Sequence, residues 1–350
     1  GGTFTSYPLR YRHEFVMYML KAMNDFADMF CTPTFNVIKF REFFELPADV
    51  KDAERTKRIH EKLLKIKGTT TLEKEQLRNE TSKVRCPILC IETRPDCALP
   101  VHIDDILKLG GTRVELGVQS LYDPVLEKVE RGHNDQETID ATQRLRDALL
   151  KVGYHMMLGL PGSTKQSDID MFKELFENPA YKPDALKIYP CLVFKGTKLY
   201  QQWEKKEFLP IDAHEAAQRI IEIKKYVEPY CRIMRVQRDI PTYMVEAGVE
   251  KTNLRQEIFE LMKKKKIICR CIRCREPKTM DIDWRNVKMQ RYDYEAARGK
   301  EIFLSFDDIK NDKILGFTRM RMPYKPYRPE ITPRTAGIRE IHVYALCYLT

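Results

Sequence analysis

Short apolar runs alternate with amphipathic segments between about residues 86 and 240. The runs at residues 113–118, 154–158 and 185–189 are typical of buried strands, and the segments between them carry apolar residues at helical spacing. Strands that alternate with helices indicate a parallel sheet, open or closed into a barrel. The other elements predicted here are strands at 88–92 and 232–236 and helices at 103–109, 168–176, 212–227 and from a cap at Asn134 or Asp135 to Gly153.

The pattern changes on either side of this region. Residues 11–29 and 54–67 have helical periodicity, and a loop is expected at 69–71. Beyond residue 278 the apolar positions recur at every second residue, which indicates strands with one buried face. These strands are predicted at 286–294, 301–306, 313–321 and 337–344, with turns at 296–300, 307–312 and 323–333. We therefore expect an antiparallel meander that forms a second domain.

Composition limits the class of protein. A chain of 350 residues with 43% hydrophobic and 32% charged residues is typical of a soluble globular protein of two domains, or of one barrel with an appendage. Ten cysteines without even spacing indicate reduced thiols, so a cytoplasmic location is expected. The formal net charge of +10 favours a polyanionic partner, most simply nucleic acid. No membrane association is expected.

Cys269, Cys271 and Cys274 place three thiols within six residues, in a strongly basic stretch of the chain. Neighbouring cations favour the thiolate form that binds metal, and tetrahedral zinc takes such thiolates. The alternative is two buried thiols and one stray thiol on a strand. The density of the cluster favours a zinc site.

A fourth zinc ligand is missing from this run and has to come from a distant segment. His342 and Cys347 are the candidates, because both lie in a later strand-like segment, and His342 is preferred. A metal that joins distant segments would be structural and would staple two domains together.

Polar residues follow the predicted parallel strands. Glu92, Gln119, His155 and the pair Tyr189-Pro190 are all expected at carboxyl ends of strands, where barrels of this kind build their active sites. Simpler explanations are a salt bridge from Glu92 to a nearby arginine and a strand-end cap by Gln119.

Several motifs occur in a fixed order along the chain. They are GGTFT at 1–5, NET at 79–81, IETRPD at 91–96, VELGVQS at 114–120, YHMMLGLPG at 154–162, RVQRDIP at 235–241, NLRQ at 253–256, the cysteine cluster, EIFLSFDD at 301–308 and IREIHVY at 338–344. Together they resemble the catalytic subunit of Elongator, a family of radical S-adenosylmethionine and acetyltransferase-like proteins that modify the wobble uridine of tRNA.

The resemblance implies an α/β fold in three parts. Residues 1–240 would form a partial (β/α) radical S-adenosylmethionine barrel, 241–277 a linker with the zinc-binding cysteines, and 278–350 part of an antiparallel α+β domain of the acetyltransferase (GNAT) type. The residues implied to bind S-adenosylmethionine are Gly1, Gly2, Thr3, Glu92, Gln119, Arg131 and, where related enzymes carry an acidic residue, His155.

The resemblance also implies a reaction. A 4Fe-4S cluster and S-adenosylmethionine would generate a radical on the acetyl group of acetyl-CoA, which adds to C5 of the wobble uridine and leaves 5-carboxymethyluridine after hydrolysis. The family's cluster cysteines and its acetyl-CoA pyrophosphate loop are not found in the sequence, so we expect this chain to be incomplete at both ends and inactive alone. No catalytic residue is assigned.

The expected partners are the tRNA anticodon loop and acetyl-CoA, with other Elongator subunits or a second copy of the chain as further partners. Phosphates of tRNA would be bound by basic side chains. The candidates are Lys263, Lys264, Lys265, Lys266, Arg270, Arg273, Arg275, Arg235, Arg238, Arg319 and Arg321. For the four lysines, the alternative is that they form the solvated end of a helix.

Two other functions remain open at this point. One is a radical S-adenosylmethionine enzyme that acts on a small molecule, of the porphyrinogen type. The other is a non-catalytic, zinc-stapled scaffold that binds RNA. The cysteine cluster and the meander favour the tRNA-modifying enzyme over the first of these.

Overall fold

The computed structural model describes residues 2–237, 240–249, 253–278, 282–332 and 334–344. The chain divides into two compact units. The first consists chiefly of Thr3–Ile91 and Asp104–Thr112, and the second chiefly of Glu92–Ile103 and Arg113–Thr350. No helix within the described residues is long and apolar enough to cross a membrane.

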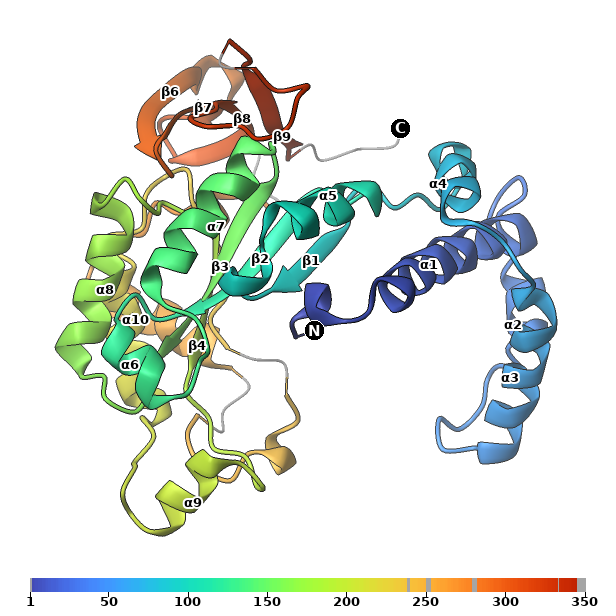
Figure 1. The fold of residues 1–350 in the computed structure, drawn as a ribbon, viewed down its shortest axis with the longest axis horizontal. Helices are drawn as coiled ribbons and strands as arrows, with labels where there is room; N and C mark the ends of the chain where they lie inside the picture. The colour runs from blue at the N-terminus through green and yellow to red at the C-terminus, as the bar shows by residue number, and fades with distance from the viewer. Residues whose placement is uncertain (1, 238–239, 250–252, 279–281, 333, 345–350) are drawn as a thin grey trace. The chain divides into compact units, whose positions relative to one another are not determined.

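The first unit is helical (Figure 1). Val16 and Leu20 on the first long helix pack against Leu72 and Leu109 in a small apolar core. The predicted helices at 11–29 and 54–67 and the loop at 69–71 are confirmed. The helices of this unit are η1 (Phe4–Ser6), α1 (Leu9–Phe30), α2 (Val37–Phe43), α3 (Ala53–Lys67) and α4 (Leu72–Thr81).

A five-stranded sheet is the centre of the second unit, and its strands follow one another in sequence order. The three pairings from β2 to β5 are parallel, as the alternation of strands and helices predicts. The strands are β1 (Cys90–Thr93), β2 (Arg113–Gln119), β3 (Lys151–Leu158), β4 (Ala185–Pro190) and β5 (Arg232–Arg235), and the helices that accompany them are α5 (Pro100–Lys108), α6 (Asp123–Lys128), α7 (Asp135–Asp147), α8 (Lys165–Glu177), α9 (Lys198–Glu204) and α10 (Ala213–Ile223).

Helix α7 begins where its cap predicts but ends earlier than expected. The Asn134 side chain accepts a hydrogen bond from the Glu137 backbone N–H, which completes a capping box. The helix stops at Asp147, and Leu149 then takes a left-handed φ of 63° that turns the chain into β3. The prediction that Gly153 closes this helix is therefore wrong, because Gly153 lies inside β3 and pairs with Ala185 of β4.

The predicted antiparallel meander is confirmed as a separate four-stranded sheet (orange to red in Figure 1). Its order is β6 (Val287–Ala296), β7 (Gly299–Asp308), β8 (Lys313–Met322) and β9 (Gly337–Val343). Between the two sheets in sequence lie α11 (Leu254–Lys264) and the single-turn α12 (Ile272–Arg275).

Buried charges join the two sheets. Asp184, directly before β4, is fully buried and pairs with Arg339 of β9 at 2.7 Å, with Arg146 of α7 at 3.3 Å and with Arg319 of β8 at 3.6 Å. Burial alone would raise the pKa of Asp184, but the charges of Arg146 and Arg339 outweigh it and hold the pKa well below its usual range. Its stabilising effect is thus present above about pH 4 and is lost only as the pH falls through the lowered pKa.

A second buried carboxylate completes the network. Glu301 of β7 pairs with Arg339 at 2.7 Å and with Arg321 of β8 at 2.9 Å, and Arg321 also contacts Asp147 at the end of α7 at 2.6 Å. All of these side chains are fully buried, so each charge depends on its neighbours for neutralisation.

Replacing Glu301 by Gln should lower the free energy of unfolding by about 3–5 kcal/mol, because buried arginines then lose a charge partner. Urea unfolding measures this loss. The matched control is Arg285→Gln, whose ion pair with Asp283 lies on the surface and whose loss should leave the midpoint unchanged. Wild-type stability in the Glu301→Gln variant would contradict the proposed role of the network.

Candidate functional site

Four neighbouring strands of the parallel sheet each contribute one charged side chain to a single cluster. The residues are Glu92 of β1, Glu115 of β2, His155 of β3 and Lys187 of β4. The Lys187 ammonium lies 2.8 Å from Glu92 Oε1 and also contacts Glu115 Oε2. His155 Nε2 lies 2.7 Å from Glu115 Oε2 and 3.7 Å from Glu92 Oε1. Parallel pairing of His155 with Lys187 brings the two basic groups side by side.

The two carboxylates of this cluster differ in their surroundings. The Glu115 side chain is 4% exposed, whereas that of Glu92 is 33% exposed. Burial alone would raise the pKa of Glu115, but the hydrogen bond with His155 and the charges of Arg113 and Lys187 outweigh it and lower the pKa. Glu115 is therefore an ionised internal anchor, and Glu92 is the carboxylate that a ligand can reach.

The end of β2 offers a second set of polar groups. Gln119 has a left-handed φ of 70°, and its buried Oε1 has no hydrogen-bond partner among the described residues. Arg131 donates a hydrogen bond of 2.7 Å to the Gly117 carbonyl, and a Cβ at Gly117 would collide with this guanidinium. A strained residue with an unsatisfied buried acceptor is typical of a binding site.

The structure thus brings the residues implied for S-adenosylmethionine together in two groups. Glu92 and His155 share the ionic cluster, and Gln119 and Arg131 meet beside Gly117. The expectation that His155 lies at a strand end is wrong, because β3 continues from it to Leu158.

The glycine-rich segment at the start of the chain is only partly described. Gly1 lies outside the described residues. Gly2 and Thr3 lie in no strand and lead directly into η1.

The three clustered cysteines do come together. The sulfur atoms of Cys269, Cys271 and Cys274 lie within 4.8 Å of one another, and Cys269 and Cys271 are buried. The single turn of α12 places Cys271 and Cys274 close in space, with a backbone hydrogen bond of 2.9 Å between them. Zinc–sulfur bonds of about 2.3 Å set tetrahedral sulfurs about 3.8 Å apart, so this donor set fits zinc.

A buried cation accompanies the thiols. Lys224, directly after α10, is 2% exposed, and its ammonium lies 3.5 Å from Cys274 Sγ. Burial alone would lower the pKa of Lys224, but the charges of the three cysteines outweigh it and raise the pKa. The lysine therefore neutralises part of the negative charge that thiolates bring to the site.

The fourth zinc ligand predicted from the sequence does not join this group. The His342 ring stacks on Phe317 at 5.4 Å and lies 4.4 Å from the Tyr344 ring. Its nitrogens are not within the set of ligand atoms formed by the three thiols. Cys347, the other candidate, lies outside the described residues.

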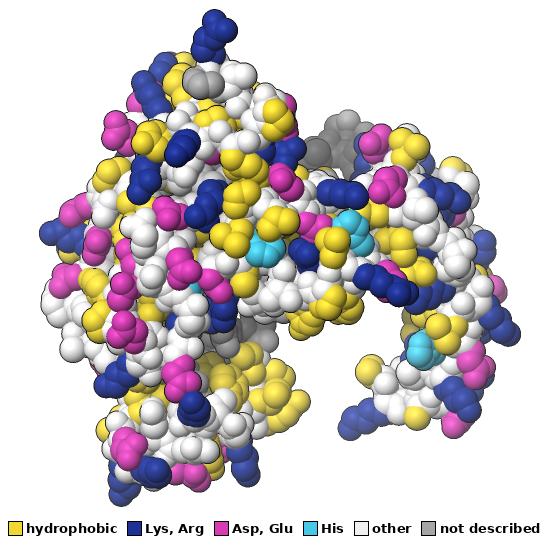
Figure 2. Space-filling view, in the orientation of Figure 1, with side chains coloured by type: hydrophobic (Ala, Val, Ile, Leu, Met, Phe, Trp, Pro, Cys, Tyr) yellow, Lys and Arg dark blue, Asp and Glu magenta, His cyan; other side chains and the backbone are white. Residues whose placement is uncertain are grey.

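The basic residues predicted to bind tRNA fall into two classes. Lys263 to Lys266 form an exposed run at the end of α11, and Arg270 is half exposed and pairs with Asp312 at 3.0 Å. Arg235 is exposed at the end of β5, and Arg238 lies outside the described residues. On the face seen in Figure 2, basic and acidic side chains intermingle, so net charge alone marks no binding patch there.

Three of the predicted RNA contacts are wrong. Arg275, Arg319 and Arg321 have side chains that are at most 1% exposed and are held by carboxylates. They belong to the interior, where an external phosphate cannot reach them. Arg273 and Arg275 both lie in the helical turn α12.

Sequence reasoning missed Glu115, Lys187 and Lys224. A signal existed for the first two, because each interrupts an otherwise apolar strand that the parallel sheet buries. A charge at such a position requires a partner inside the protein. Lys224 carried no such signal, since it follows an amphipathic helix on which a lysine is ordinary.

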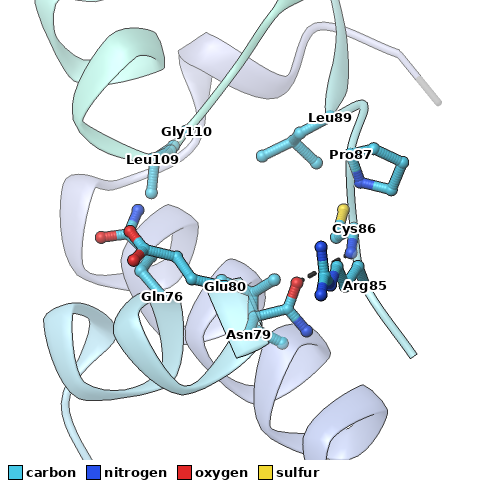
Figure 3. A pocket seen from close by; sticks show the side chains of 10 residues that line it. Gln76, Asn79, Glu80, Arg85, Cys86, Pro87, Leu89, Leu109 and Gly110 are labelled. Atoms are coloured by element: carbon cyan, nitrogen blue, oxygen red, sulfur yellow. Dashed lines mark hydrogen bonds between the residues drawn. The ribbon is translucent and has the colours of Figure 1, made fainter. Parts of the chain in front are cut away.

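Four further cysteines differ in exposure. Cys191 is buried, Cys90 is exposed, and Cys86 and Cys97 are partly buried. Cys86 lines a cavity of about 250 Å³ in the first unit, together with Asn79 and Arg85 (Figure 3). Asn79 Oδ1 accepts a hydrogen bond of 2.7 Å from the Cys86 backbone N–H, so this residue shapes the cavity wall.

Replacing Lys224 by Met should lower zinc affinity about 10- to 100-fold, because the thiolates lose their buried counter-ion while all three sulfurs remain. Competition with a chromogenic chelator measures the affinity. Unchanged affinity would show that Lys224 plays no part in the metal site.

Two further variants test the ligand set itself. Cys271→Ser should lose bound zinc, whereas His342→Ala should retain it, since His342 is stacked on Phe317 outside the group. Metal content is measured by atomic absorption after dialysis. Zinc loss from His342→Ala would return this histidine to the ligand set.

Comparison with known proteins agrees with this geometry. A model of the Radical SAM superfamily matches residues 47–175, and a model of the Radical_SAM C-terminal domain matches residues 183–264. The tRNA uridine(34) acetyltransferase of Methanocaldococcus infernus is 49% identical over 280 residues, which cover 78% of this chain and 52% of that protein. Elongator complex protein 3 of Saccharomyces cerevisiae is 39% identical over 309 residues, 86% of this chain and 55% of that protein.

The chain spans about half the length of these two relatives. Among solved structures, the archaeal Methanocaldococcus infernus Elp3 with an N-terminal deletion of residues 1–46 matches with a TM-score of 0.84. The match has 42% sequence identity and covers 98% of this chain and 72% of that one. Likeness of this extent in both sequence and fold shows that the chain belongs to the Elongator complex protein 3 (Elp3) family.

Proposed function

We propose that the protein is the catalytic part of a tRNA-modifying enzyme that forms 5-carboxymethyluridine at the wobble uridine from acetyl-CoA and S-adenosylmethionine. The match to archaeal Elp3 over 98% of the chain carries this proposal. Two relatives that are 49% and 48% identical are named tRNA uridine(34) acetyltransferase, and this name supports tRNA uridine as the substrate and an acetyl group as the group transferred. A cytoplasmic location accords with the reduced thiols that the site requires.

S-adenosylmethionine is proposed to bind to the parallel sheet, at the charged cluster on β1 to β4 and the polar groups at the end of β2. Glu92, Gln119 and Arg131 are the central residues, with His155, Gly1, Gly2 and Thr3 as further contacts. The unsatisfied Oε1 of Gln119 and the partly exposed carboxylate of Glu92 are acceptors for hydroxyl and amino groups of such a ligand. When bound, S-adenosylmethionine supplies the radical chemistry, and these side chains orient it and exclude water.

An iron–sulfur cluster is held by cysteine thiolates. Among the described residues a single trio of cysteines comes together, and its place is beside the buried Lys224. We assign this trio to structural zinc and derive no step through a cluster. The acetyltransferase-like role of the antiparallel sheet likewise remains a proposal, supported by the order β6–β7–β8–β9.

tRNA is proposed to contact the exposed run Lys263–266, together with Arg270, Arg273 and Arg235. Such cations neutralise backbone phosphates and release counter-ions. The proposed partners are therefore the tRNA anticodon loop and acetyl-CoA, with Elongator subunits or a second copy of the chain as further partners.

The tRNA proposal is tested by binding to tRNA and to duplex DNA with the same number of phosphates, across a salt series. We expect tighter binding to tRNA that persists at moderate salt, because recognition then includes more than phosphates. Equal and equally salt-sensitive binding to both would contradict tRNA recognition by this chain.

The proposed surface is tested in the same assay. Replacing Lys263 to Lys266 by Gln should flatten the slope of log affinity against log salt by about 2, because about two or three phosphate contacts are lost. The control is the double variant Lys205→Gln, Lys206→Gln. These exposed lysines follow α9, in a different part of the second unit. A control that flattens the slope as strongly would refute a local surface.

A further inference from the structure

We propose that Lys187 is the positioning residue for Glu92, and that it holds this carboxylate so that one oxygen faces the ligand. This inference rests on the proposed binding of S-adenosylmethionine to the parallel sheet. Lys187 and Glu92 come from β4 and β1, which are not neighbours in the sheet, and their side chains meet at 2.8 Å.

The anchor of Lys187 is Glu115. This carboxylate is almost fully buried and both of its oxygens are engaged, Oε1 by Arg113 and Oε2 by His155 and Lys187. Each of its oxygens is therefore bound by a neighbouring cation or imidazole, which restrains its geometry. Its fixed negative charge restrains the Lys187 ammonium at the centre of the cluster.

Glu92 is held from one side only. Lys187 donates to Oε1, and His155 lies 3.7 Å from the same oxygen. No hydrogen bond from a described residue reaches Oε2, and the side chain is one-third exposed. The bond to Lys187 thus fixes the plane of the carboxylate and leaves Oε2 as an acceptor for a hydroxyl or ammonium donor.

The ammonium also keeps the site electrically balanced. Glu92 and Glu115 carry two negative charges, and Lys187 with Arg113 carries two positive ones. Without Lys187, the two carboxylates would share the imidazole of His155, and Glu92 would be drawn towards it and away from the ligand. Lys187 therefore acts on the ligand through Glu92 and does not contact the reacting atoms.

The test measures binding of S-adenosylhomocysteine, a stable analogue, by isothermal titration calorimetry on the whole chain. We expect Lys187→Met to weaken binding at least about tenfold, the effect of one hydrogen bond to a charged group. Lys187→Arg should recover part of the loss, because a guanidinium can still join the two carboxylates. Glu92→Gln should weaken binding by a similar factor, since the same contact is affected.

Lys151→Met is the matched control. Lys151 is also a mostly buried lysine on the same sheet and is paired with Glu340. It is the first residue of β3 and lies outside the charged cluster. Both Met variants should lower the thermal midpoint, whereas only Lys187→Met should lower affinity. A structural role alone would make the two variants equal in both measurements.

The outcomes separate this inference from the proposed function. Absence of binding by the wild-type chain would reject the S-adenosylmethionine site itself. Wild-type binding with an unchanged or tighter affinity in Lys187→Met would overturn the positioning role and leave the proposed function standing. The positioning role would be supported if Lys187→Met lowered the affinity, Lys187→Arg recovered part of it, and Lys151→Met left the affinity unchanged.

Discussion

Charges buried between the two sheets have to be neutralised by one another, and this requirement fixes how the sheets meet. Asp184 directly precedes β4 of the parallel sheet, and Glu301 lies on β7 of the antiparallel sheet. Arg339 bridges the two carboxylates with a contact of 2.7 Å to each. A shift of one sheet by a single residue would separate these partners and leave charges unpaired in the interior, at a cost of several kcal/mol. The network therefore specifies one arrangement of the two sheets, which apolar packing alone would leave less well defined.

The three charged clusters of the second unit differ in what they leave open. Around Asp184 and Glu301 every carboxylate oxygen is engaged, so that cluster can only support structure. In the cluster on the parallel strands, one oxygen of Glu92 accepts no hydrogen bond from the described residues, and the thiol cluster offers three ligands to a metal that takes four. The two places where a ligand can bind are therefore distinguished by incomplete hydrogen bonding or an incomplete ligand set, and not by charge itself.

The alternation of apolar runs and helical segments was enough to predict both sheets and most of their strands, because a buried parallel strand and a half-buried antiparallel strand have different periods. Gln119 and the cysteine trio were also predictable, since their position or spacing is local. Residues such as Arg319 and Arg321 were not, because an arginine in a half-buried strand is expected to be exposed until the fold places a carboxylate beside it, Asp184 for Arg319 and Asp147 for Arg321. The position of His342 likewise depended on Phe317, which lies on the neighbouring strand β8.

The linker is held by a contact that the sequence pattern did not reveal. A zinc ion was expected to staple two domains together, and Arg275 also joins this segment to both sheets. Its guanidinium donates to the Pro229 carbonyl before β5 at 3.0 Å and to Asp307 of β7 at 2.7 Å, and thus joins both sheets. A rigid, always charged fork of donors meets these separate acceptors without any metal. Arg275 therefore links the two sheets through contacts that are separate from the thiol cluster.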